Sequence, residues 1–314
     1  MEKRKIAVVG AGLVGCGWAI VFARAGFRVN VFDVDPSIRA AVTGRISAAL
    51  ADMEMAGLVE ERETIAARVT VEDELRSAVR GASYVQESVF ERQDIKKDVS
   101  SQIDAVMHPQ AIVGSSSSGI PASAFTEHLK NRERFLVVHP VNPPHLVPLV
   151  ELVRAPWTDS AALASVRELM EEVGQTPITV RREIEGFVLN RLQGALLNEA
   201  WALFEEGYAS AEDIDRTVRD GLGLRWSFMG PFETIDLNAP GGVGDYAQRL
   251  GPLYHKIALD RRDPRPWSEA LIRRVEAERR AKLSPDELAE RRAWRDRRLM
   301  ALVAHRRRMI TEEQ

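Results

Sequence analysis

Residues 5–33 read KIAVVGAGLVGCGWAIVFARAGFRVNVFD, and this stretch decides the fold. An apolar strand leads into the pattern Gly10-x-Gly12-x-x-Gly15, a helix of small and apolar residues follows, and a second strand ends near Asp33. Glycines also gather in ordinary tight turns, so the pattern is specific only because a strand precedes it and a helix follows it. This order predicts the first βαβ unit of a parallel sheet.

The same segment predicts a dinucleotide site. Gly10 would form the turn, Gly12 would let the backbone approach a pyrophosphate, and Gly15 would let the helix pack closely on the strand. Leu13 and Val14 open that helix, whose N-terminal amides would face the phosphates. We therefore expect these five residues to bind the cofactor.

Asp33 indicates which cofactor is bound. Its carboxylate should accept hydrogen bonds from the adenine ribose hydroxyls, and its charge would repel a 2′-phosphate, so NAD is expected rather than NADP. Arg39 lies nearby, but its helical position and the intact acid argue against a phosphate clamp. Cys16 is expected only to pack beside the phosphate-binding helix.

The first half of the chain alternates short apolar runs with helical stretches, which is typical of a doubly wound α/β sheet covered on both faces. Helices are predicted at Arg92–Met107 and Ser160–Val173. The predicted strands are Lys5–Gly10, Arg28–Val34, Val69–Glu72, Tyr84–Val89, Ala111–Ser115, Phe135–Val141, Leu146–Val153 and Thr176–Val180.

The pattern changes at Gly186. From there on only helical periodicity is visible, with Gly207 as a helix stop, Ser210 and Asp213 as a capping box, and a charged helix over Ser284–Met309. The sequence thus predicts a Rossmann-type domain over residues 1–185 and an all-helical domain over residues 186–314.

Composition excludes several classes of protein. The 314 residues have a net charge of -3, which gives no electrostatic reason to expect nucleic acid. The single cysteine rules out a disulfide or a thiolate metal cluster within one chain, and no metal is expected. No apolar run is long enough to span a bilayer, and the basic N-terminus leads into the glycine pattern rather than a cleavage site. We expect a cytoplasmic protein with no membrane partner.

His139 is the candidate base. It follows the apolar run FLVV, at the carboxyl end of a predicted strand, where α/β folds bind their ligands. The turn VNPP then reverses the chain, so the next extended segment could bring Glu151 beside His139. A carboxylate there would fix the imidazole tautomer and stabilise the imidazolium. A buried ion pair joining two strands is the alternative. His145 lies in the turn and lacks an obvious orienting acid.

Two polar residues are candidate substrate contacts. Ser118 belongs to the run GSSSSG, which follows another predicted strand. Asn190 lies near the start of the helix that follows Gly186, where an amide among apolar residues needs partners. Helix capping or backbone hydrogen bonding would explain both residues equally well.

These motifs, in this order, resemble the 3-hydroxyacyl-CoA dehydrogenase family and, within it, the lambda-crystallin type, whose activity is that of L-gulonate 3-dehydrogenase. The resemblance runs from GAGLVG through HPVNPP and GFVLNRL to EEGYASAEDID and GPFETIDLN. It implies that His139 is the base oriented by Glu151, and that Ser118 and Asn190 bind the reacting oxygen.

The resemblance also implies that Glu91 and Lys96 lie at the nicotinamide side of the cofactor, and that the helical domain forms a homodimer and closes over the site. The chain departs from the fatty-acyl enzymes at Ser116-Ser117-Ser118-Gly119, at Pro140-Val141 after the histidine, and at GLGLRWSFMGP, which adds Arg225 and Trp226.

Charge helps to separate the possible substrates. Residues 52–74, where the acyl-CoA enzymes have an arm that contributes to the coenzyme A site, carry eight acids and two bases and would repel its phosphates. Arg225 could instead bind the carboxylate of a small 3-hydroxy acid, although a surface ion pair would also explain it. A short-chain 3-hydroxybutyryl-CoA dehydrogenase, an L-carnitine dehydrogenase and a non-catalytic, crystallin-like structural protein remain alternatives.

Overall fold

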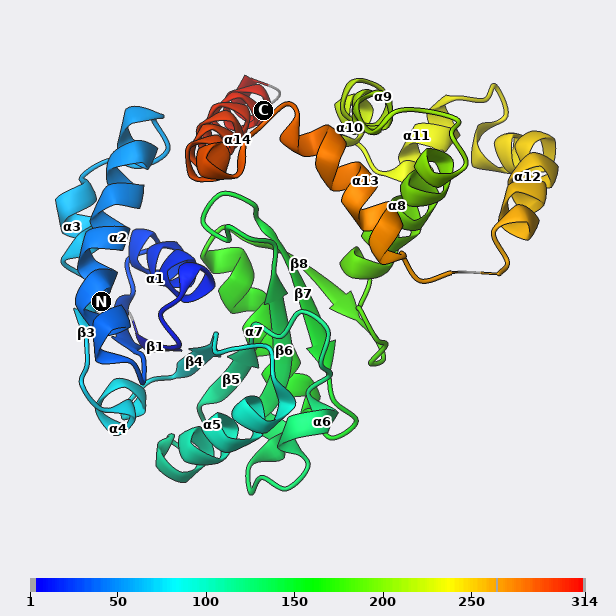
Figure 1. Cartoon of the computed structure of the whole chain (residues 1–314). Helices are drawn as coiled ribbons and strands as arrows, with labels where there is room; N and C mark the ends of the chain where they lie inside the picture. The colour runs from blue at the N-terminus through cyan, green and yellow to red at the C-terminus, as the bar shows by residue number, and fades with distance from the viewer. Residues whose placement is uncertain (1–3, 264, 313–314) are drawn as a thin grey trace. The chain divides into compact units, whose positions relative to one another are not determined.

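The computed structural model describes residues 4–263 and 265–312. Its centre is one sheet in the order β3-β2-β1-β4-β5-β6-β7-β8 (Figure 1). Neighbouring strands are parallel except β6 and β7, which are antiparallel. The strands are β1 (Lys5–Val9), β2 (Arg28–Phe32), β3 (Val69–Val71), β4 (Tyr84–Glu87), β5 (Ile112–Ser115), β6 (Phe135–Pro140), β7 (Leu149–Arg154) and β8 (Thr176–Val180). The predicted doubly wound α/β sheet is confirmed.

Successive side chains of each strand enter different cores, as the two-residue period of a strand requires. Ile6 and Val8 of β1 pack on one face of the sheet, whereas Ala7 and Val9 pack on the other. This two-sided burial explains why the strands read as continuous apolar runs. The helices of this part are α1 (Leu13–Arg24), α2 (Pro36–Met55), α3 (Arg62–Ala66), α4 (Leu75–Val79), α5 (Gln93–Val106), α6 (Ser123–Thr126) and α7 (Ser160–Glu172).

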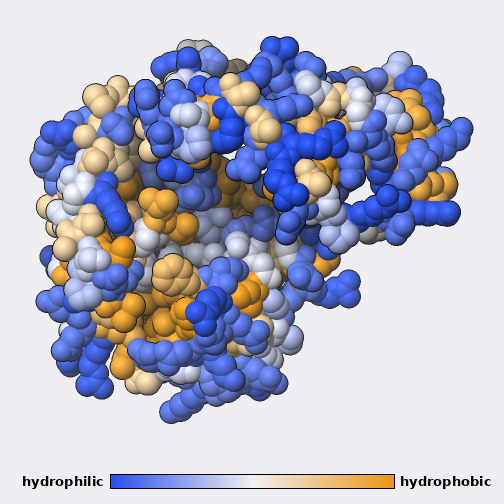
Figure 2. Space-filling view, in the orientation of Figure 1, coloured by the Kyte–Doolittle hydropathy of each residue, from blue (hydrophilic) through white to orange (hydrophobic). Residues whose placement is uncertain are grey.

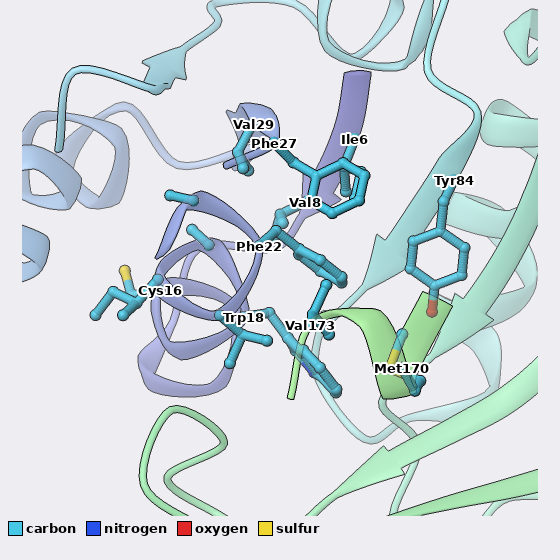
Figure 3. Packing of buried hydrophobic residues seen from close by; sticks show 14 of the residues in the cluster. Ile6, Val8, Cys16, Trp18, Phe22, Phe27, Val29, Tyr84, Met170 and Val173 are labelled. Carbon is cyan, nitrogen blue, oxygen red and sulfur yellow. The ribbon is translucent and has the colours of Figure 1, made fainter. Parts of the chain in front are cut away.

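The larger core lies between α1, α2, α7 and the sheet. Trp18 and Phe22 of α1 are fully buried there, with their rings stacked at a centroid distance of 5.5 Å (Figure 3). Tyr84 of β4 meets the edge of Phe22 at 5.8 Å. Burying one such side chain contributes roughly 1.5–3 kcal/mol, so α1 is fixed firmly against the strands. The N-terminus of α1 therefore has a defined position at the carboxyl edge of the sheet.

The chain forms two compact units. The first comprises the residues up to Arg191 together with those from Arg291 onward, and the second comprises Leu192–Glu290. The last helix, α14 (Leu288–Glu312), returns to the first unit, where Met300 is buried in the larger core. The sequence instead predicts a division at residue 185, with α14 in the helical domain, and that division stays a prediction.

The described part of the second unit contains helices and no strands. Its helices are α8 (Leu189–Glu205, which begins in the first unit), α9 (Ala211–Arg216), α10 (Gly223–Trp226), α11 (Pro231–Leu237), α12 (Gly242–Asp260) and α13 (Glu269–Arg280). Ser210 caps α9 by accepting the Asp213 amide, as predicted. The predicted C-terminal helix begins one turn later than expected, because Pro285–Glu287 form a 3₁₀ turn.

One predicted strand was misplaced. The strand predicted at Leu146–Val153 begins only at Leu149 and ends at Arg154. The amides of Leu146 and Val147 both donate to the Pro143 carbonyl at 3.0 Å, so these residues belong to the turn. Where the other predicted strands differ from the structure, their ends do so by one or two residues.

Candidate active site

The glycine loop after β1 has the geometry that the sequence predicts. Gly10 has a φ of +93°, and a Cβ there would lie 2.5 Å from the Ser88 carbonyl oxygen. A Cβ on Gly15 would lie 1.8 Å from the Gly10 carbonyl oxygen, so only glycine allows this approach of α1 to β1. A Cβ on Gly12, by contrast, meets nothing within 4 Å. The loop is closed at Gly10 and Gly15 and open at Gly12.

The N-terminus of α1 faces that open side. Gly12 is the N-cap, and among the residues that the structure describes no side chain caps the first turn of the helix. The first amides of a helix need acceptors and attract anions. A backbone-lined cradle with donors at its base fits a dinucleotide pyrophosphate. Beside it, the Cys16 thiol donates to the Ala11 carbonyl and is buried, as expected of a packing residue.

Asp33 lies directly after β2 and holds the glycine loop. Its Oδ2 accepts the Ala11 amide at 2.7 Å, and its Oδ1 accepts the Asp35 amide at 3.0 Å. The carboxylate predicted to meet the ribose thus also fixes the loop. Arg39 donates to the Asp33 carbonyl at 2.8 Å and lies 3.4 Å from an Asp73 oxygen, so its guanidinium is already engaged.

His139 and Glu151 lie side by side. The antiparallel register of β6 and β7 places them opposite each other, and Nδ1 of His139 is 2.8 Å from Oε2 of Glu151. Burial raises the pKa of Glu151, but hydrogen bonds from His139 and from two backbone amides outweigh burial and lower that pKa. An ionised carboxylate can only accept, so Nδ1 of His139 carries a proton, and in the neutral imidazole the lone pair then lies on Nε2.

The other oxygen of Glu151 binds the start of α8. Oε1 accepts the amides of Val188 and Leu189 at 2.9 and 3.0 Å. The preceding residues, Gly186 and Phe187, both have positive φ values, and the Phe187 ring is buried 5.7 Å from the His139 ring. A left-handed non-glycine residue is strained, and such residues gather at functional sites. This turn aims the two amides at the carboxylate.

Ser118 and Asn190 are brought together. The Asn190 side-chain amide donates to the Ser118 carbonyl at 2.6 Å. Asn190 directly follows Leu189, whose amide donates to Glu151. The first turn of α8 therefore links the His139–Glu151 pair to the loop that carries Ser118. The backbone hydrogen bond considered at the sequence level is therefore present.

Glu91 and Lys96 contact partners that the sequence did not predict. Oε1 of Glu91 accepts the amides of Ser118 and Gly119 at 2.8 and 3.0 Å, and it also accepts the Ser117 hydroxyl. Lys96 is fully buried, 3.5 Å from Glu91 and 3.1 Å from Glu87. Sequence reasoning missed Glu87, although a polar residue at the end of the apolar run of β4 was the available signal.

His145 is not part of this arrangement. Its Nδ1 is buried without a hydrogen-bond partner among the described residues, and its carbonyl accepts from Arg24. Burial, together with the nearby Arg24 charge, lowers the pKa of His145 to about 4, so the ring is neutral near pH 7. This agrees with the view that it lacks an orienting acid.

Arg225 belongs to the second unit, on α10, whereas the other predicted site residues belong to the first. No ion pair joins it to another side chain within residues 4–263 or 265–309. The surface salt bridge considered as an alternative is therefore absent from the described part of the chain. In that part there is also no metal-binding group of acidic, histidine or cysteine side chains, and no helix that could cross a membrane.

The chain belongs to the 3-hydroxyacyl-CoA dehydrogenase family. The family's NAD-binding domain matches residues 5–184, and its C-terminal domain matches residues 186–283. The protein is thus an NAD-binding member of a family of oxidoreductases. The glycine cradle and Asp33 fit that cofactor.

Several members of this family resemble the chain over most of its length. The chain is 41% identical to the lambda-crystallin homolog of Bos taurus, over 95% of this chain and 94% of that one. It is 38% identical to L-carnitine dehydrogenase of Streptomyces coelicolor, over 79% and 78%. Among solved structures, the NAD⁺-dependent 5-formyl-3-hydroxy-2-methylpyridine 4-carboxylic acid 5-dehydrogenase superposes with a TM-score of 0.82 at 29% identity, covering 97% of both chains. The similarity to the lambda-crystallin type spans nearly the whole sequence.

Gly12 separates folding from cofactor binding. We expect Gly12→Ala to leave the melting temperature unchanged, because the added methyl meets no protein atom within 4 Å and φ is -66°. NAD affinity should fall about tenfold or more, equivalent to about 1.4 kcal/mol, because the methyl would occupy the cradle. Titration with NAD and thermal unfolding measure both effects.

Gly44→Ala is the matched control, since Gly44 lies within α2 and its Cβ also meets nothing within 4 Å. It should bind NAD normally and gain about 0.5–1 kcal/mol of stability. Unchanged NAD affinity in Gly12→Ala would contradict the assignment of this loop.

Proposed function

We propose that this protein oxidises the 3-hydroxyl of a small hydroxy acid with NAD, as an L-gulonate 3-dehydrogenase of the lambda-crystallin type. The observation that carries the proposal is the buried His139–Glu151 pair at 2.8 Å. It provides a base with a fixed tautomer in a chain that binds NAD. The resemblance to the lambda-crystallin type supports the substrate class.

The residues divide the chemistry among them. Nε2 of His139 takes the hydroxyl proton, and the buried Glu151 carboxylate stabilises the imidazolium that forms. Ser118 and Asn190 hydrogen-bond the reacting oxygen from their joined loop and helix. A bound NAD would supply the acceptor for the hydride that leaves the carbon bearing this hydroxyl. The contribution expected from a positioned base is about 10² to 10⁴ in rate.

The acidic arm over residues 52–74, which begins in the last turn of α2, supports a small substrate over a CoA ester. All of its acids except Glu72 are exposed, and its two arginines are committed elsewhere. Arg62 lies 2.9 Å from Glu63 and 3.5 Å from Glu54, and Arg68 donates to the Ala23 carbonyl. This surface offers no unengaged cation to the phosphates of coenzyme A.

Arg225 is proposed to bind the substrate carboxylate. Its planar fork suits a carboxylate, and no acidic residue of the described chain neutralises it. Carnitine carries a quaternary ammonium and would need an aromatic cage, for which Trp226 supplies one wall. The clamp would also fit the carboxylate of carnitine, so the preference for a sugar acid rests on the quaternary ammonium, for which Trp226 alone makes no cage.

His139→Asn tests the chemistry. We expect turnover to fall by about 100-fold or more, because an asparagine side chain has no imidazole nitrogen to take the hydroxyl proton. NAD affinity should be unchanged, since the glycine loop is untouched. Initial rates and NAD titration measure the two properties. His128→Asn is the control, because His128 is exposed and bonds only Ser101. Near-normal turnover in His139→Asn would refute His139 as the base, whereas no turnover in the unaltered protein would leave the structural, non-catalytic alternative standing.

Substrate choice is tested by NADH formation with L-gulonate, 3-hydroxybutyryl-CoA and L-carnitine. We expect L-gulonate to give the highest kcat/KM. In Arg225→Met the KM for L-gulonate should rise about tenfold or more, because a charge-assisted hydrogen bond is lost, whereas a neutral alcohol should be little affected. Arg219→Met is the control, since Arg219 already pairs with Asp220. A preference for the CoA ester would overturn the substrate assignment.

We also propose that the protein is a homodimer held by its helical unit. Only Phe204, Thr234, Ala239 and Leu271 are buried among the described residues of Leu192–Glu290. Such a unit buries too little apolar surface to be stable alone. Figure 2 shows apolar residues at the surface of α12, which carries exposed Leu253 and Ile257.

Sedimentation should therefore give twice the chain mass. Leu253→Glu with Ile257→Glu should shift the protein toward monomer, because two charges would enter an apolar interface. Lys256→Glu, an exposed position on the same helix, should not change the mass. A monomer in the unaltered protein would refute the dimer.

A further inference from the structure

A cluster of three charged side chains lies under the serine loop. Lys96 of α5 places its ammonium 3.1 and 3.2 Å from the two oxygens of Glu87 and 3.5 Å from Glu91. The Lys96 and Glu87 side chains are each 1% exposed. Glu87 also accepts the Val89 amide at 2.7 Å and the hydroxyl of Ser115, its partner in the β4–β5 register.

The charges of this cluster do not cancel. In each of its described hydrogen bonds Glu87 is the acceptor, as an ionised carboxylate is. Burial raises the pKa of Glu91, but the Lys96 ammonium and hydrogen bonds from residues 117–119 outweigh it and lower that pKa. Two carboxylates share one ammonium, which leaves one net negative charge. The Glu91 side chain is 38% exposed, but Glu87 and Lys96 are buried, so water screens the Glu87 charge weakly.

Strand order places this charge along the cofactor. The glycine loop follows β1 and His139 ends β6, and the sheet runs β1-β4-β5-β6 between them. Adjacent strands are about 4.8 Å apart, so a cofactor bound at the loop must cross the ends of β4 and β5 to reach His139. Glu87 is the last residue of β4, and Ser115 is the last residue of β5.

We propose that Glu87 is a positioning residue that holds Lys96 and Glu91 and gives this edge a net negative charge, which favours the cationic, oxidised nicotinamide over the neutral, reduced one. The proposal rests on NAD binding rather than on the identity of the alcohol. Glu87 would have two effects. It holds Lys96, which in turn holds Glu91 and the Ser118 loop, and its residual negative charge sets the ratio of NAD⁺ affinity to NADH affinity.

The test is the pair of dissociation constants for NAD⁺ and NADH, measured by fluorescence titration of the full chain without substrate. Glu87→Gln keeps the size and most hydrogen bonds but makes the cluster neutral. We expect NAD⁺ to bind about tenfold more weakly while NADH affinity stays the same or rises. High salt should reduce the difference little, because the group is buried.

Ser115→Ala is the matched control, since it removes one hydrogen bond from Glu87 and keeps every charge. Its NAD⁺ to NADH affinity ratio should equal that of the unaltered protein. Equal weakening of both cofactor forms in Glu87→Gln would show a merely structural role and overturn the proposal. If that variant does not fold, Glu91→Gln decides in the same way, because it removes the same charge. These titrations are independent of turnover, so failure with L-gulonate would leave them interpretable.

Discussion

The buried carboxylate of Glu151 is the interaction on which the site depends. It is fully buried and its two oxygens serve different partners, His139 on the neighbouring strand and the Val188 and Leu189 amides at the start of α8. An isolated buried charge would cost several kcal/mol, so these three donors are what keep it ionised. The same hydrogen bonds that set the imidazole tautomer therefore also fix where the helix that carries Asn190 begins.

A second constraint comes from the reversal of strand order beside β1. Because β2 lies on one side of β1 and β4 on the other, the loops after β1 and β4 part at their carboxyl ends and leave room for a ligand. Gly10 is essential there, since any side chain would strike the Ser88 carbonyl just past β4. The glycine loop and the Glu87 cluster are thus held at a fixed separation by two adjacent strands of one sheet.

Features that depend on residues close together in the sequence could be predicted. The glycine fingerprint, the sheet, and the approach of Glu151 to His139 across a proline turn all result from spacing and chain reversal. The left-handed Phe187 could not be predicted, because no local pattern requires that φ. The ammonium that Lys96 shares with Glu87 and Glu91 was not predicted, because these contacts depend on how α5 packs beside the end of β4. The burial of Met300 in the larger core was not predicted either, because it depends on residues far apart in sequence.

The residues proposed to act on the cofactor and the residue proposed to bind the substrate carry opposite charges. The edge beneath the cofactor is negative, through Glu87 and Glu91, whereas the substrate handle proposed for the second unit is the cation Arg225. The negative edge acts on the cofactor whatever the alcohol, whereas the proposed role of Arg225 concerns the substrate whatever the redox state of the cofactor. The two charges would therefore contribute to different binding constants, one for the cofactor and one for the substrate.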